Sequence, residues 1–235
     1  HYKNILAMKK FLITAAAALA AIGASAQSYL LNNPSNTSYF GIRASYDMTC
    51  PGKMKTDLGK TKVLGIGSGA SLGIVYNQPL VANLYIEPGV TFYYHTESIE
   101  PEYLSSIAKK TFQNRSLRKF GAEVPVMFGY HFDFTPSVSL SVMTGPVLNV
   151  GISNDYYITT KEVAGHKFHT SGTMYNDYGM NRVGCDWRFG AGLTFSGTYY
   201  VAVTGDVGMC NMLKDNNANA SLRENGVKFT LGYNF

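Results

Sequence analysis

Apolar and polar side chains alternate along most of the chain beyond about residue 38. In the segment 40–48, the even-numbered positions are all apolar, whereas the odd-numbered positions are Gly, Arg, Ser and Asp. An alternation with period two indicates a β-strand with one apolar face. The segments with this pattern are 40–48, 64–76, 84–94, 120–131, 138–150, 186–195, 199–209 and 227–235. The sequence therefore predicts eight strands and no long helix in this part of the chain.

The connections between these segments alternate between short and long. The short ones are 78–83, 133–137 and 196–198, and the long ones are 50–63, 96–117, 152–182 and 213–224. Short turns at one end and long loops at the other are typical of antiparallel barrels in outer membranes, where the long loops face outward. We therefore expect an up-and-down arrangement that brings both ends of the barrel domain to the turn end.

The pattern alone does not say which face points inward, because a soluble lipocalin-like barrel has the same alternation. Two features favour the membrane. The polar face is mostly small residues, and the bulky apolar face would overfill the interior of so narrow a barrel. Aromatic residues also gather at both ends of the apolar face, as in the two girdles of membrane barrels. They are Phe40, Tyr76, Tyr130, Tyr199, Tyr233 and Phe235 at the turn end, and Tyr46, Tyr94, Phe120 and Trp187 at the loop end. The predicted fold is all-β, an antiparallel up-and-down eight-stranded transmembrane β-barrel.

The amino-terminal part has the features of an export signal. Met8-Lys9-Lys10 precedes a short apolar run, and Ala24-Ser25-Ala26 follows it. A basic region, an apolar region and an A-x-A site indicate a secretory signal peptide. We therefore predict an upstream extension plus signal peptide over 1–26, with cleavage before Gln27. A short periplasmic segment over 27–38 and the barrel over 39–235 would follow.

Charge gives no indication of a nucleic-acid partner. The whole chain has 20 basic and 15 acidic residues. Lys3, Lys9 and Lys10 lie in the predicted leader, which has no acid, so the remaining chain has a net charge of only +2. Charged residues make up 15% of the chain, against about 25% in an average soluble domain. These values fit an exported membrane protein, and we expect no nucleic-acid partner.

Several short stretches resemble the Bacteroidetes outer-membrane β-barrel (porin-family) proteins, which are similar in shape to the OmpA- and OmpX-like barrels. These stretches are Glu87-Pro88-Gly89-Val90, Glu123-Val124-Pro125, Gly145-Pro146-Val147-Leu148-Asn149, Asp186-Trp187-Arg188-Phe189-Gly190-Ala191-Gly192 and Phe229-Thr230-Leu231-Gly232-Tyr233-Asn234-Phe235. The resemblance covers about residues 39–235 and implies an outer-membrane location without implying one activity. It also implies that Phe229, Leu231, Tyr233 and Phe235 form the signal read by the barrel-assembly machinery.

The polar face predicts a network of charges inside the barrel. A tight hairpin at 196–198 would pair Phe195 with Tyr199 and would place Arg188 opposite Asp206, so we predict an ion pair there. Buried charges persist when they are paired. The expected members are the acids Glu87, Glu123, Asp186 and Asp206 and the bases Arg43, Arg188 and Lys228. One interpretation of this charge network is a gated or proton-selective pore. The favoured interpretation is a rigid, plugged interior, because side chains roughly fill a barrel of about eight strands.

Other candidate chemistry is weak. Gly69-Ala70-Ser71-Leu72-Gly73 matches the G-x-S-x-G elbow of hydrolases, but it lies within a predicted strand rather than at a strand-to-helix turn. His166 and His169 lack nearby acids, so a metal site there is disfavoured. In the predicted register Cys185 faces lipid and Cys210 faces the lumen, so no disulfide is expected. We expect no catalytic residues, no metal and no cofactor, and no enzyme.

The favoured function is a structural or interaction scaffold that displays its outer loops, because binding often resides in loops on a rigid frame. The candidate contact residues are Lys53, Lys55, Lys60, Lys62, Tyr156, Tyr157, His166 and His169. Lipopolysaccharide is a candidate partner for the four lysines, and an unknown surface ligand or protein for the rest. A narrow porin for small solutes is one alternative. An outer-membrane component of a secretion system is another, through distant similarity to PorT-like barrels.

Overall fold

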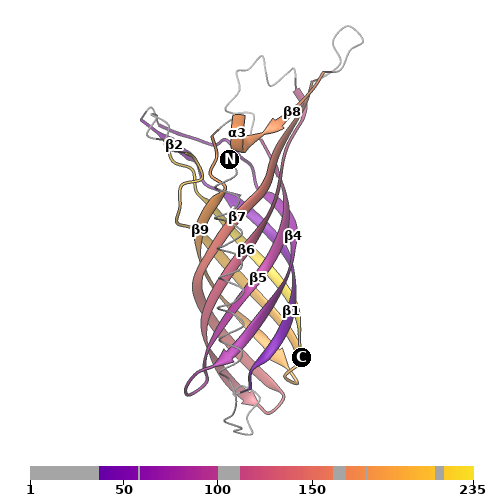
Figure 1. The fold of residues 1–235 in the computed structure, drawn as a ribbon, viewed down its shortest axis with the longest axis vertical. Helices are drawn as coiled ribbons and strands as arrows, with labels where there is room; N and C mark the ends of the chain where they lie inside the picture. The colour runs from indigo at the N-terminus through magenta and orange to yellow at the C-terminus, as the bar shows by residue number, and fades with distance from the viewer. Residues whose placement is uncertain (1–36, 58, 100–111, 161–167, 178, 215–219) are drawn as a thin grey trace, which may run out of the picture.

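The computed structural model describes residues 37–57, 59–99, 112–160, 168–177, 179–214 and 220–235. The predicted signal peptide and most of the predicted periplasmic segment lie outside these residues. Eight long strands form a closed antiparallel barrel, as predicted (Figure 1). They are β1 (Tyr39–Pro51), β4 (Gly67–Pro79), β5 (Leu84–Ser98), β6 (Phe112–Thr135), β7 (Val138–Thr160), β9 (Val183–Phe195), β10 (Tyr199–Gly208) and β11 (Glu224–Asn234).

Each strand pairs with its neighbours in the order β6-β5-β4-β1-β11-β10-β9-β7, and pairing of β6 with β7 closes the ring. The first and last strands, β1 and β11, lie side by side, with Asp47 opposite Lys228. Two of the four long connections carry short elements at the loop end: β2 (Met54–Thr56) and β3 (Gly59–Thr61) follow β1, and β8 (His169–Thr173) and α3 (Met174–Asp177) follow β7. The carboxyl terminus lies at the turn end (Figure 1).

The apolar face of each strand points out of the barrel. Leu72 and Leu231 are 59% and 65% exposed, whereas the inward-facing Asp47 and Lys228 are 1% and 5% exposed. The aromatic rings predicted at the turn end meet on the outer surface, where the centroids of Phe40 and Tyr76 lie 4.7 Å apart. The fold is thus that of a transmembrane barrel, with small and charged residues inside and an apolar outer wall.

The hairpin between β9 and β10 has the predicted register. Phe195 pairs with Tyr199, and Arg188 pairs with Asp206. Ser196 and Gly197 at the turn both have positive φ values, 52° and 70°. Positive φ at the central positions gives the turn the twist that joins two adjacent strands without splaying them.

Several strand boundaries differ from the sequence prediction. The strands β6 and β7 continue well beyond the apolar alternation, to Phe112 and Thr160, and β8 pairs with the extended part of β7. Outside the apolar wall both faces of a strand can be polar, so the backbone ladder continues after the alternation has ended. The strand β4 begins at Gly67 rather than at Leu64, which is buried at the loop end instead of facing outward.

A small apolar core closes the loop end of the barrel. Leu64, Leu117, Tyr175, Met180 and Leu222 are its buried members, and we call them the cap cluster. Residues from β6 and from the first, third and fourth long connections thus pack together. Arg182 lies over the ring of Tyr175 at 4.3 Å from its centroid. Burial raises the pKa of the Tyr175 hydroxyl, an effect that the guanidinium partly opposes.

The helix α3 has four residues and forms a single turn. In the part of the chain that the structure describes, no helix has the length and apolar character needed to span a membrane.

Candidate functional site

The centre of the lumen holds a network of charged side chains built around Arg188. Its Nε and one terminal nitrogen donate to the two carboxylate oxygens of Asp206, at 2.6 and 2.8 Å, so the predicted ion pair forms. The same terminal nitrogen donates to Oε2 of Glu123 at 2.8 Å. The strand β7 separates β6 from β9, so the contact with Glu123 spans two strand spacings.

Lys228 extends this network to the opposite wall. Its Nζ donates to Oε1 of Glu123 at 3.0 Å and to Oδ2 of Asp47 at 3.1 Å. The same Asp47 oxygen lies 2.9 Å from Nε2 of His95. All six side chains are buried. Burying a charge is costly unless an opposite charge and hydrogen bonds compensate for it. Arg188 and Lys228 each contact two acids.

Arg43 and Glu87 form a separate group nearer the turn end. The guanidinium lies 3.6 Å from Oε2 of Glu87, donates to Asn234 at 2.8 Å and stacks over the ring of Tyr200 at 4.2 Å. Asn77 donates to the same Glu87 oxygen at 3.4 Å. Long polar and aromatic side chains thus occupy much of this end of the lumen.

A third group lies near the loop end, below the cap cluster. Nζ of Lys119 donates to Oε1 of Glu97 at 2.7 Å and also to a carboxylate oxygen of Glu224. The hydroxyl of Thr49 donates to the same Glu97 oxygen at 2.8 Å. Glu97 is 2% exposed, so this carboxylate is held almost wholly away from solvent.

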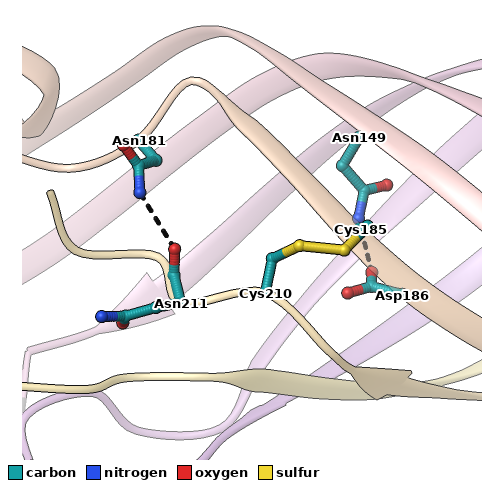
Figure 2. The surroundings of a disulfide bond; sticks show 6 residues. All are labelled: Asn149, Asn181, Cys185, Asp186, Cys210 and Asn211. Carbon is teal, nitrogen blue, oxygen red and sulfur yellow. Dashed lines mark hydrogen bonds between the residues drawn. A yellow bond between two sulfur atoms is a disulfide. The ribbon is translucent and has the colours of Figure 1, made fainter.

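Asp186 stands apart from these groups, although the sequence placed it in the network. Its carboxylate accepts a hydrogen bond from Nδ2 of Asn149, as Figure 2 shows. Among the described residues it forms no ion pair. Asp186 lies near the loop end of β9, two residues before Arg188. The bases of the central network do not reach it there.

The charged groups divide the remaining space in the lumen. One cavity of about 110 Å³ lies on the loop side and a second of about 60 Å³ on the turn side. Glu123 and Lys228 line both cavities. The central network therefore forms a partition across the lumen.

The predicted loop surface is divided between two sides of the barrel. The strands β2 and β3, with the four lysines on and beside them, lie on the side of β1 and β11, and β8 lies on the side of β7 (Figure 1). Tyr157 is exposed and lies beneath Arg118, whose guanidinium is 4.6 Å from the ring centroid. Tyr156 instead packs against the cap cluster. His169 belongs to β8, and His166 lies outside the described residues.

The G-x-S-x-G match lies inside β4, as the alternation predicts. Ser71 is buried and faces the lumen. A hydrolase elbow needs an exposed serine on a sharp turn between a strand and a helix, so the motif is explained by lumenal packing. Across the described residues, no group of three or more His, Cys, Asp or Glu side chains is placed to hold a metal ion.

Solved structures similar in shape to this chain are small outer-membrane barrels. The attachment invasion locus protein Ail of Yersinia pestis has 13% sequence identity and a TM-score of 0.39, over 84% of this chain and 99% of its own. Neisserial surface protein A has 14% identity and a TM-score of 0.38, over 85% and 99%. OprG of Pseudomonas aeruginosa has 10% identity and a TM-score of 0.43, over 85% and 97%.

These similarities are too low to carry an argument about function from any of those proteins to this one. No family model matches the chain, and no curated protein matches it. The resemblance to Bacteroidetes porin-family and PorT-like barrels therefore stays a prediction.

Several members of the charged groups were not predicted from the sequence. They are Asp47, His95, Glu97, Lys119 and Glu224. A signal for all five was present, because each lies an even number of residues from a predicted lumenal residue on its own strand: Asp47 from Arg43, His95 and Glu97 from Glu87, Lys119 from Glu123, and Glu224 from Lys228. The predicted strands were too short to include four of these five.

The expectation of no disulfide is wrong. Cys185 and Cys210 are bonded, with their Cα atoms 5.3 Å apart (Figure 2). The predicted register would have placed their side chains on opposite faces. The regular ladder ends at Gly208, however, and the backbone N–H groups of Met209 and Cys210 both donate to the carbonyl of Cys185, at 3.0 and 3.1 Å. This bulge turns Cys210 towards Cys185. Cys50 is free.

The disulfide ties the fourth long connection to the start of β9, which gives a testable expectation. The double variant Cys185→Ser/Cys210→Ser should keep the barrel folded but lose about 2 kcal/mol of unfolding free energy, the lower end of the usual range for a native disulfide. Protease sensitivity between Met209 and Arg223 should increase, as measured by limited proteolysis and mass spectrometry. Cys50→Ser is the control and should change neither quantity. Unchanged stability and cleavage in the double variant would contradict a structural role for the bond.

Proposed function

We propose that this chain is an outer-membrane β-barrel that serves as a rigid, closed scaffold, with its loop end displayed outside the cell. The favoured contact surfaces are the extension formed by β6, β7 and β8, with Tyr157 and His169, and the loop-end lysines. The proposed partners are the lipid of the outer membrane, the barrel-assembly machinery during insertion, and a surface ligand or protein. No enzymatic role is proposed.

The apolar outer wall supports a membrane location. Long exposed side chains such as Phe92 and Val203 alternate with buried polar ones along the strands. In water such a continuous apolar surface would be an aggregation site, because soluble monomers rarely expose apolar patches larger than a few hundred Å². Closure of the ring also leaves no unpaired strand edge within the wall, as the hydrocarbon of a membrane requires.

The partition built by Arg188, Glu123 and Lys228 carries the proposal of a closed lumen. A pore for solutes needs a continuous path, whereas these side chains contact one another across the middle of the barrel. The cap cluster covers the loop end as a second obstruction. Moving Arg188 or Lys228 aside would take a basic partner away from a buried carboxylate, which costs several kcal/mol.

Conductance in planar lipid bilayers tests this proposal. The purified protein is inserted into the bilayer, and the current is recorded over a range of voltages. An open porin, measured in the same way, serves as the positive control for insertion. We expect no stable channel openings. Stable openings of defined size would contradict the closed scaffold.

A narrow channel is the second candidate, because the cavities on the two sides of the partition both touch Glu123 and Lys228. If the network rearranged, these two side chains would line the constriction. A channel should then change its cation selectivity in Glu123→Gln, which the closed scaffold does not predict. A role as a secretion-system component stays a prediction from resemblance, tested by deleting the gene and assaying secreted cargo.

A further inference from the structure

A small sheet at the loop end joins two segments that are far apart in the sequence. The strands β2 and β3 form an antiparallel hairpin in which Lys55 lies directly opposite Lys60. On its other side, Lys55 pairs with Ser221 through two backbone hydrogen bonds of 2.9 Å. The N–H of Gly52 donates to the carbonyl of Arg223 at 2.8 Å. The first long connection is therefore held against the fourth.

This sheet has one apolar face and one basic face. Met54 and Leu222 face the cap cluster, where Leu222 is a buried member and Met54 packs against it. Lys53 and Lys55 flank Met54, and Arg223 follows Leu222, so these three bases face the opposite way, and all three are exposed. Lys60 lies opposite Lys55 and is also exposed. We call these four bases the basic face.

The charges of the basic face repel one another. Residues directly opposite in an antiparallel pair point to the same side, and like charges at such positions destabilise the sheet. Lys55 and Lys60 occupy such a pair. Asp57 is the one acid among residues 52–64, which hold four lysines. A surface of this kind is stabilised when an anion with several negative charges lies against it.

The position of the basic face favours a lipid as that anion. The sheet follows directly from the loop ends of β1 and β11, where Pro51 pairs with Glu224. Because its apolar side packs on the cap over the lumen, the basic side points away from the barrel axis. Figure 1 shows β2 projecting sideways beyond the wall. In a membrane this places the basic face above the headgroups of the surrounding outer leaflet.

We propose that the basic face binds the phosphate groups of the outer-leaflet glycolipid beside β1 and β11. The proposal rests on the outer-membrane location proposed above and names the lipid chemistry that this surface selects. Lysine ammonium groups bind phosphate as point charges, and Arg223 adds a planar donor that can bind it in a bidentate manner. Backbone pairing holds these groups in place before the lipid binds.

The experiment compares lipid A that carries both phosphates with enzymatically dephosphorylated lipid A. The full exported chain is purified in zwitterionic detergent and titrated with each lipid, and native mass spectrometry gives the apparent dissociation constants. We expect the phosphorylated lipid to bind more tightly, and its affinity to fall as salt is raised. Lys55→Gln/Lys60→Gln should weaken binding of the phosphorylated lipid by about 30-fold, because each base beside an anionic surface contributes about a five-fold effect.

The control variant is Arg118→Gln/Lys214→Gln, which removes two exposed bases that do not belong to the basic face. It should leave binding within about two-fold of the wild type, because Lys55, Lys60 and their sheet remain unchanged. Folding of each variant is checked by its heat-modifiable mobility on gels. Equal binding of both lipids, or no effect of Lys55→Gln/Lys60→Gln, would overturn the proposal. So would tighter binding of a soluble sulfated polysaccharide than of phosphorylated lipid A. A protein that folds without detergent would instead refute the proposed location.

Discussion

Arg188→Met is expected to lower the free energy of unfolding by about 3–5 kcal/mol, because it leaves buried carboxylates without a compensating charge. Arg188 makes three charge-assisted hydrogen bonds, two to Asp206 and one to Glu123. Without the guanidinium, Asp206 loses its one ionic partner among the described residues, and Glu123 keeps only Lys228. The loss is measured by urea titration of the barrel in detergent, followed by intrinsic fluorescence.

The matched control removes both members of the pair. In Arg188→Met/Asp206→Val the buried carboxylate disappears with its base, and Glu123 remains paired with Lys228. Replacing a buried ion pair by apolar side chains is often close to neutral, whereas removing one partner is not. The double variant should therefore be more stable than the single one. A single variant that loses less than about 1 kcal/mol would contradict a tightly coupled network, since breaking a buried pair normally costs several times as much.

Val203→Arg is expected to cost about 2–4 kcal/mol, as arginine does at the lipid-facing midplane of a barrel. Val203 points outward, halfway along β10, and pairs with Ala191 on β9 and with Phe229 on β11. An arginine there would lie in hydrocarbon, far from either headgroup region. The same urea titration, in lipid vesicles rather than detergent, measures the effect.

The same residue type placed near the interface is the control. Tyr199→Arg also faces outward, but at the turn end among the aromatic residues of that rim. Arginine at the interface costs about 0–1 kcal/mol. If Val203→Arg cost no more than Tyr199→Arg, the middle of β10 would not lie in lipid.

The strands and one lumenal pair were predictable because they depend on local pattern. Period-two alternation predicts the faces of β1 or β10 without any tertiary information. A tight turn at Ser196 fixes the register between β9 and β10, and that register alone places Arg188 opposite Asp206. Asp47 lies opposite Lys228 on β1 and β11, but no turn joins these two strands, so their register depends on closure of the barrel and could not be predicted in the same way.

Other contacts depend on features that no local pattern encodes. Arg43 reaches Glu87 across β4, and Arg188 reaches Glu123 across β7. Such contacts depend on the stagger and curvature of the closed barrel. Cys210 reaches Cys185 through a bulge beyond the end of the ladder. The pairing of Lys55 with Ser221 depends on how two loops pack on the cap cluster.

The outward orientation of the apolar face is tested most directly with Trp187, the one tryptophan of the chain. Trp187 faces outward from β9, 42% exposed, near the loop end of the wall. The protein is reconstituted into vesicles whose lipids carry bromine on the upper part of the acyl chain, and tryptophan fluorescence is recorded. Strong quenching by these lipids, with little quenching by iodide in the water, is the expected result. Quenching by iodide but not by brominated lipid would show that the apolar face does not contact the membrane.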